Sequence, residues 1–206
     1  ITLKMFQPPY VRKICLFVLF LFCFKTAIGQ VVLNEVLPYP SGAQGMIPSG
    51  LEWIEVYNPT CNPVDISGWR VACRSNFGTG GAMAFPAGTI VPPLGFRVLG
   101  NGQGVVGPYC NTGNWVMQNL DGWIALYDAS GTPLEGIFWT NTQSKINNSS
   151  DADFSPNPCN VGGGSLQSAY QINQLGLMTY VGNNPAAGTI YKRMPDAGPW
   201  QSGGAH

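Results

Sequence analysis

The stretch Leu51–Val71 places the tightest limits on how this chain can fold. It reads LEWIEVYNPTCNPVDISGWRV. Aromatic and β-branched residues crowd Leu51–Asn58, which favours an extended strand. Two Asn-Pro pairs then end it, because proline lacks the N–H that a β-ladder needs and restricts the residue before it. Gly68-Trp69 opens the next extended run, so we expect a strand, a turn and a second strand.

The chain after Gln30 repeats this pattern of short extended runs and turns, with no convincing helix. Asp128–Gly131 is typical of a β-turn, with Asp first and Gly fourth. Many short strands at this spacing favour a β-sandwich or barrel. The expected strands are Val31–Leu37, Leu51–Asn58, Trp69–Ser75, Ala82–Phe85, Thr89–Val91, Gly95–Leu99, Trp115–Met117, Trp123–Tyr127, Leu134–Trp139 and Thr189–Met194.

Side-chain alternation assigns faces to these strands. In Trp69–Ser75, the face with Trp69, Val71 and Cys73 is the expected core face. The face with Arg70, Ala72 and Arg74 is expected to meet water. We also expect Trp53 and Trp69 to be buried.

Trp123–Tyr127 is different, because it is apolar on both faces and something must cover the second one. The natural cover is Thr140–Gly188, an insertion rich in Asn, Ser and Gly. Within it, only the apolar patch Leu175–Val181 is expected to form a strand. A sugar-stacking surface is the alternative use of the aromatics Tyr109, Trp115, Trp123 and Trp139, and burial in the core is preferred.

The amino terminus resembles a signal peptide. Met5 is a plausible start, which makes residues 1–4 upstream read-through, and Arg12 and Lys13 precede the apolar run Ile14–Phe24. That run is shorter than the roughly 18–20 residues of a membrane-spanning helix. Small residues at Ala27–Gly29 predict cleavage before Gln30. We therefore expect residues 1–29 to be removed and the protein to be secreted or held at the cell surface, with no membrane span left.

Two other interpretations of this segment stay open. One is an uncleaved membrane anchor. The other is a lipoprotein anchor on Cys23, which is disfavoured because the bulky Phe22 precedes it.

The charge balance after the signal argues against nucleic acid as a partner. Ten acidic and six basic residues follow Gln30, a net charge of −4, and there is no Lys/Arg run. A nucleic-acid binder needs a basic patch. The remaining length suits one domain, 30–201, with residues 202–206 as a flexible end or linker.

Four cysteines follow the signal, namely Cys61, Cys73, Cys110 and Cys159. An even number in an exported chain indicates disulfides. We favour Cys61–Cys73, which would close a short loop across the opening turn, together with Cys110–Cys159. Four unpaired thiols are the alternative. Zinc is disfavoured because there is no CxxC pair and no histidine near a cysteine.

Catalytic machinery is not apparent. The only histidine is His206, which argues against Ser/His/Asp and Cys/His nucleophile systems. Glu52 and Glu55 are separated by an odd offset and so face opposite ways. Glu35 and Glu55 could meet if their strands are neighbours, as an acid/base pair, as a cation site or, more commonly, as hydrogen-bond acceptors.

Asp151 and Asp153 are weak candidate ligands for Ca²⁺ in the insertion. Carboxylate oxygens are the donors that Ca²⁺ prefers, but the spacing lacks the Asp-x-Asp-x-Asp-Gly pattern. We therefore expect no cofactor, with calcium as a minor possibility.

Six motifs in chain order resemble the lamin tail domain family of exported bacterial type. They run from Val31 to Trp200 and leave Thr140–Gly188 outside. Ala197 departs from the family, whose bacterial members often have Gly there, and the cysteines are not required by it. The motif residues are Asn34-Glu35, the Trp53–Asn58 strand with Glu55, Gly68-Trp69, Phe85-Pro86, the Asp128–Gly131 turn, and Arg193-Met194-Pro195-Asp196 with Trp200.

The resemblance implies an all-β, immunoglobulin-like sandwich with a loop-rich insertion before the last strand. It also implies a binding or structural module without catalytic residues, whose partner is an unidentified protein or glycan. An accessory domain of a longer exported hydrolase or nuclease is the alternative. A carbohydrate- or calcium-binding domain is a weaker one.

Overall fold

The computed structural model describes residues 30–39, 52–75, 80–100, 117, 121–150, 152–154 and 164–204. All of its elements lie in one compact unit, Val31–His206. The predicted signal segment 1–29, the expected strand at 115–117 apart from Met117, and the expected Cys110–Cys159 pair lie outside the described residues. No helix in the described part of the chain is long and apolar enough to cross a membrane.

One sheet has five strands in the order β14-β13-β1-β2-β7. Every neighbouring pair in it is antiparallel. Its strands are β1 (Val32–Leu37), β2 (Trp53–Tyr57), β7 (Phe96–Gly100), β13 (Thr189–Arg193) and β14 (Trp200–Gly204).

The second sheet has seven strands in the order β11-β10-β5-β4-β8-β9-β12. A third, two-stranded sheet pairs β3 (Val64–Asp65) with β6 (Ile90–Val91). The strands of the second sheet are β4 (Arg70–Ser75), β5 (Gly80–Ala84), β8 (Gly122–Tyr127), β9 (Pro133–Trp139), β10 (Ala152–Phe154), β11 (Gly164–Leu166) and β12 (Met178–Gly182).

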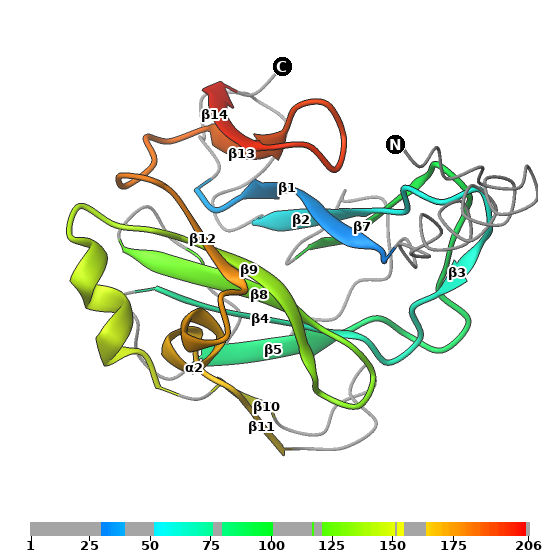
Figure 1. Ribbon diagram of the computed structural model, residues 1–206, viewed down its shortest axis with the longest axis horizontal. Helices are drawn as coiled ribbons and strands as arrows, with labels where there is room; N and C mark the ends of the chain where they lie inside the picture. The colour runs from blue at the N-terminus through cyan, green and yellow to red at the C-terminus, as the bar shows by residue number, and fades with distance from the viewer. Residues whose placement is uncertain are drawn as a thin grey trace, which may run out of the picture. The chain divides into compact units, whose positions relative to one another are not determined.

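The two large sheets face each other across one apolar core, as expected for a sandwich (Figure 1). Strand β2 shows the alternation plainly: Ile54 and Val56 are fully buried, whereas Trp53, Glu55 and Tyr57 are half-exposed on the other side. The chain is therefore all-β in its main layers, and the immunoglobulin-like sandwich predicted from the motifs is confirmed. The expected burial of Trp53 is wrong, because its register on β2 turns it outward. Trp69 is partly buried against this core.

Two glycines of the motifs have backbone conformations that explain them. Gly68 has φ +73° at the turn that leads into β4, and Gly131 has φ +86° at the end of the predicted β-turn. Side-chain-bearing residues rarely adopt this region. At Gly68 the chain also pairs with Phe85, whose carbonyl accepts the Gly68 N–H at 2.9 Å. The strand–turn–strand expected from Leu51–Val71 thus forms, with β3 added within the turn.

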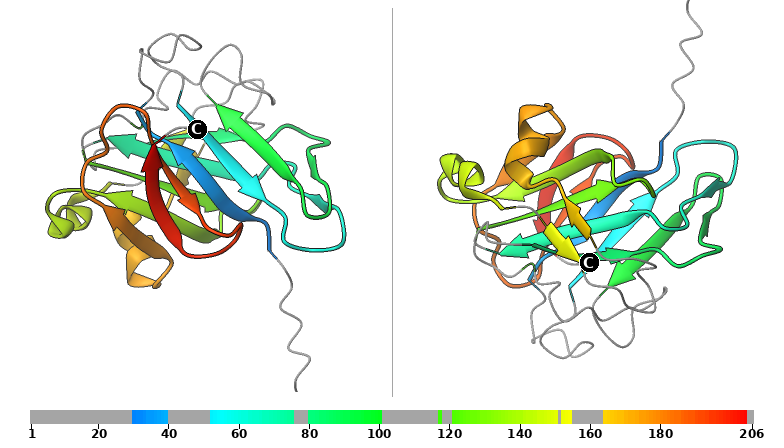
Figure 2. Two further views of the ribbon diagram at one scale, coloured as in Figure 1. Left: turned by 90° about the horizontal axis from the view of Figure 1, so that it is seen from above. Right: turned by 90° about the horizontal axis from the view of Figure 1, so that it is seen from below.

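A second core lies on the far side of the seven-stranded sheet (Figures 1 and 2). All six residues of β8 are buried. Trp123, Ala125 and Tyr127 pack there against Leu166 and Ile172, both from the insertion. The prediction that the insertion covers the second face of this strand is confirmed.

The insertion is more ordered than expected. Besides β12, which matches the predicted patch, it holds β10, β11, the 3₁₀ helix η2 (Gln143–Asn148) and the short helix α2 (Ala169–Gln174). Helix α2 begins with a capping box, in which Ser168 accepts from the Gln171 backbone N–H and Gln171 reaches back to the Ser168 N–H. The expectation that only Leu175–Val181 is ordered is therefore wrong.

The face of β4 that was expected to meet water is also part of this second core. Ala72 is fully buried in it, and Arg70 and Arg74 are half-buried. Strand β4 pairs with β5 and β8, so its second face lies under the same cover as that of β8. The two arginines suggested an exposed face, but a long charged side chain can lie with its stem buried along an apolar surface.

Truncating the insertion's apolar contact should destabilise the fold. Ile172 is fully buried, and Ile172→Ala is expected to lower the free energy of unfolding by about 2–4 kcal/mol through a cavity in the second core. Leu175→Ala is the matched control, because Leu175 is 58% exposed and should cost less than about 0.5 kcal/mol. Urea denaturation monitored by tryptophan fluorescence measures both. Equal effects would show that the insertion does not pack on the sheet.

Candidate functional site: the polar junction and the outer face

Asn34 occupies a β-bulge on β1. The β1–β2 register shifts between Leu33 and Glu35, which leaves Asn34 as the extra residue. Its buried carboxamide donates to Glu55 Oε1 at 3.0 Å and to Asp196 Oδ1 at 3.2 Å, and accepts from the Ala197 N–H at 3.2 Å. Ala197 has φ +59°, in the left-handed region. That conformation is easiest for glycine, the residue that the resemblance to bacterial members of the family leads us to expect here.

Arg193 reaches from β13 to both sheets. Its Nε donates to the Leu33 carbonyl at 2.8 Å and its Nη1 to the Gly198 carbonyl at 2.8 Å. Its Nη2 forms an ion pair with Glu135 Oε2 on β9, and the guanidinium lies 4.9 Å from the Trp200 ring centroid. The other Glu135 oxygen accepts the Leu33 N–H at 2.5 Å. We call Asn34, Glu55, Glu135, Arg193 and Asp196 the polar junction.

Burial controls the acidity of the two glutamates in this junction. Desolvation raises the pKa of Glu135, and the charge of Arg193 with the Leu33 N–H only partly offsets it. Desolvation also raises the pKa of Glu55; the Asn34 hydrogen bond opposes this, and the charges of Glu35 and Asp196 add to it. Every carboxylate in the junction accepts a hydrogen bond from a neighbouring group. The junction therefore has a structural role, since it links strands of both sheets and the turn at Asp196.

Glu35 and Glu55 do come together, as predicted for neighbouring strands, since they are directly paired across β1 and β2. They lie on the outer face of the five-stranded sheet, which we define as Glu35, Trp53, Glu55, Tyr57, Phe96, Val98 and Lys192. The Tyr57 and Phe96 rings are 4.8 Å apart between centroids, and Phe96 is 38% exposed. This face offers aromatic and carboxylate groups together.

The other signature residues have structural roles. The fully buried Asn58 donates to the carbonyls of Asn62, Val91 and Pro92 and accepts from Thr60, which holds the loop after β2. Asp128 accepts the Ser130 and Thr132 N–H groups at 2.8 and 2.9 Å. Burial would raise the pKa of Asp128, but these hydrogen bonds outweigh it and the pKa is lowered.

The structure describes two of the four aromatic residues considered for sugar stacking, Trp123 and Trp139. Trp123 and Trp139 are fully buried and belong to the two cores. Tyr109 and Trp115 lie outside the described residues. Partly exposed aromatic side chains lie instead on the outer face, at Trp53, Tyr57 and Phe96.

The expected Cys61–Cys73 disulfide is not formed. Cys61 is exposed in the turn after β2, whereas Cys73 is fully buried on β4 in the core between the sheets. A disulfide needs the two Cβ atoms about 3.8 Å apart. The sequence places the two residues close along the chain, but β4 carries Cys73 into the other sheet.

The structure describes only one of the two weak calcium candidates. Asp151 lies outside the described residues, and Asp153 belongs to β10, where it pairs with Ser165 of β11. Among the described residues, no group of three or more His, Cys, Asp or Glu side chains could hold a metal ion. Calcium binding there therefore remains an untested expectation.

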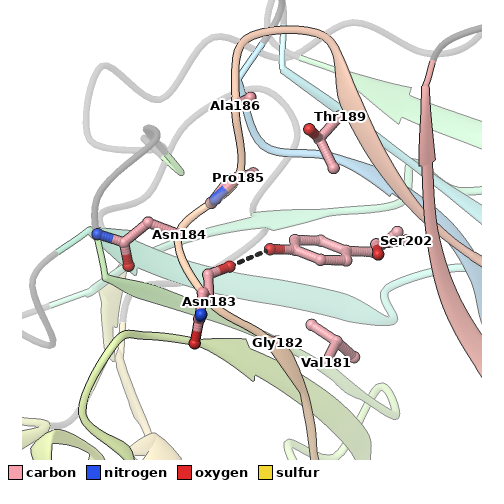
Figure 3. A pocket seen from close by; sticks show the side chains of 9 residues that line it. Val181, Gly182, Asn183, Asn184, Pro185, Ala186, Thr189 and Ser202 are labelled. Carbon is pink, nitrogen blue, oxygen red and sulfur yellow. Dashed lines mark hydrogen bonds between the residues drawn. The ribbon is translucent and has the colours of Figure 1, made fainter.

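A pocket of 240 Å³ lies between the β12–β13 connection and β14 (Figure 3). The Tyr191 hydroxyl, on the pocket wall, donates to the Asn183 carbonyl at 2.8 Å. Burial raises the pKa of Tyr191, so the hydroxyl stays protonated. The pocket's lining includes no carboxylate, lysine, arginine or cysteine, and it offers polar contacts rather than acid–base chemistry.

The raised pKa of Glu55 predicts a pH-dependent contribution to stability. The folded state holds this proton more tightly than the unfolded one, whose pKa is near 4.5. The contribution is therefore complete below pH 4.5 and is lost as the pH rises through the folded pKa. Glu55→Gln cannot ionise and is expected to be more stable than the original protein at pH 7, by less than about 1 kcal/mol for a half-exposed group.

Thermal unfolding between pH 4 and 7 checks this, with the two proteins equal near pH 4. Asp65→Asn is the control, because hydrogen bonds from Ser67 lower the pKa of that exposed carboxyl. It should not gain stability at pH 7. A Glu55→Gln difference that is independent of pH would contradict the assignment.

The comparison with known families agrees with these motifs. The family model of the Lamin Tail Domain matches residues 25–152, more than half of the chain. No curated protein matches. The matched region includes the bulge on β1, the Trp53–Asn58 strand and the turn after β8, and the structure adds β13 and β14 to the same sandwich. This chain belongs to the lamin tail domain family.

Proposed function

We propose that this protein is a non-catalytic binding module that is exported and works outside the cell or at its surface. The family is a non-enzymatic, immunoglobulin-like one, which supports a binding or structural role. The observation that carries the proposal is how the polar residues are used. The carboxylates and the one side-chain amide of the polar junction are engaged in holding strands and a turn, which leaves the outer face around Glu55, with its aromatic side chains, as the surface for a partner.

The outer face suits a glycan or a protein surface. Aromatic rings can stack on the apolar faces of sugars or on protein side chains, and carboxylates accept hydroxyl or N–H donors. Tyr57 and Phe96 lie side by side, and Glu35 and Glu55 lie on the neighbouring strands. The opposite face of the sandwich is covered by the insertion and cannot serve the same purpose.

Removing one ring should weaken binding through this face. Phe96→Ala is expected to reduce binding on a glycan array at least tenfold, because stacking area is lost. Leu175→Ala is the control, since it truncates an exposed apolar side chain at the end of α2, away from the outer face. Equal binding by both variants would show that the outer face is not the binding surface.

Export is tested separately. The full chain, with an epitope tag after residue 206 and expressed in a bacterium, is expected outside the cytoplasm with Gln30 as its first residue. Cell fractionation and amino-terminal sequencing measure this. A cytoplasmic protein that retains the segment Ile14–Phe24 would overturn the export part of the proposal.

A further inference from the structure

Strand β14 is an edge strand whose own residues, Trp200–Gly204, include none of the usual protective charges or prolines. It ends the five-stranded sheet, and its five residues pair with β13 in one continuous register (Figure 2, left). Its sequence, WQSGG, contains no charge and no proline, and Gln201 and Ser202 are exposed. Natural edge strands are commonly guarded by charges, prolines, bulges or short length.

The other edge strands in the described part of the chain each carry such a guard. β11 has three residues, β7 carries Arg97, and β12 has a register shift between Tyr180 and Gly182. β14 is therefore the edge best prepared to accept another strand.

The alternation of hydrogen-bonded and non-bonded pairs between β13 and β14 shows which backbone groups of β14 remain available to another strand. The Met194 N–H donates to the Pro199 carbonyl at 3.1 Å, which makes this a bonded pair. Bonded and non-bonded pairs alternate along an antiparallel ladder. The pairs Arg193–Trp200 and Tyr191–Ser202 are thus non-bonded, and the N–H and C=O groups of Trp200, Ser202 and Gly204 point away from β13.

We propose that a second copy of this chain pairs with β14 in antiparallel fashion, with Ser202 opposite the same residue of the other copy. The sequence is self-complementary in this register. Trp200 faces Gly204 and Gln201 faces Gly203, so each large side chain of one copy lies over a glycine of the other. The absence of charge removes repulsion between identical strands. The pairing is isologous and closes as a two-fold dimer.

This dimer is independent of the proposed binding by the outer face. It uses backbone groups at one end of the sheet, whereas Phe96 lies on β7 at the other end.

Sedimentation equilibrium of the full chain tests the proposal. The mass should rise with concentration from that of one chain toward twice that value. Ser202→Pro removes a donor that points outward and leaves the β13 bonds intact, so this variant should stay at the mass of one chain with unchanged circular dichroism. Ser202→Ala keeps the donor and should associate like the original. Equal association by all three proteins would overturn the proposal, as would a monomer at every concentration.

A cross-linking experiment guards against misfolding of the proline variant. Bonded antiparallel residues have Cα atoms about 5.5 Å apart, within the range of a disulfide. In a Cys61→Ser background, Ser202→Cys should form a covalent dimer with a mild oxidant at least tenfold faster than Leu175→Cys, an exposed site away from β14. Non-reducing electrophoresis measures both rates. Equal rates would refute pairing through β14.

Discussion

The contact of Arg193 with Glu135 and the Leu33 backbone is the interaction on which this sandwich most depends. Leu33 lies on β1, Glu135 on β9 and Arg193 on β13, so one ion pair links the two sheets. Both side chains are largely withdrawn from water, at 16% and 21% exposure. Losing either charge would leave the other partly buried without its counter-ion, which costs less than the roughly 3–5 kcal/mol of a fully buried pair. The pair therefore fixes how the sheets are joined more than it adds net stability.

The bulge at Asn34 is what makes this link geometrically possible. An extra residue on β1 brings the Leu33 N–H and C=O within reach of Glu135 and Arg193, which sit on strands of different sheets. Asn34 then holds Glu55 and the turn at Asp196-Ala197. Motifs separated by about 160 residues thus meet in one network. The spacing of these motifs matches no pattern of catalytic residues, because their common role is to hold the ends of the sandwich together.

Local patterns predicted the parts of the fold that depend on local physics. The alternation around Ile54 and Val56, the turn at Asp128–Gly131 and the need for a cover over Trp123 and Tyr127 all follow from side-chain period and turn chemistry. The Glu35–Glu55 pairing followed once the strands were taken as neighbours. The predictions of the alternation, the turn and the need for a cover required no knowledge of residues distant in the sequence.

Two of the failures, at Ala72 and at the Cys61–Cys73 pair, share a non-local cause. Ala72 is buried because Leu166 and Ile172 lie over its sheet. The sequence around Arg70 and Arg74 contains no signal that these two distant residues cover it. Cys73 is carried away from Cys61 by the strand that crosses to the other sheet. Helix α2 is the exception, since Ser168 followed by Gln171 is a capping-box signal. It was missed because six residues are too few to show helical periodicity.

The second core decides which surfaces are left for partners. The insertion packs on the far side of the seven-stranded sheet, so the binding proposed above uses the outer face of the five-stranded sheet. Pairing through β14 about a two-fold axis would extend that sheet without covering the outer face at β2 and β7. Such an axis is perpendicular to the sheet, so the outer faces of both copies would point the same way. Two weak contacts with one extended target would then act together, which raises the overall affinity without any new contact.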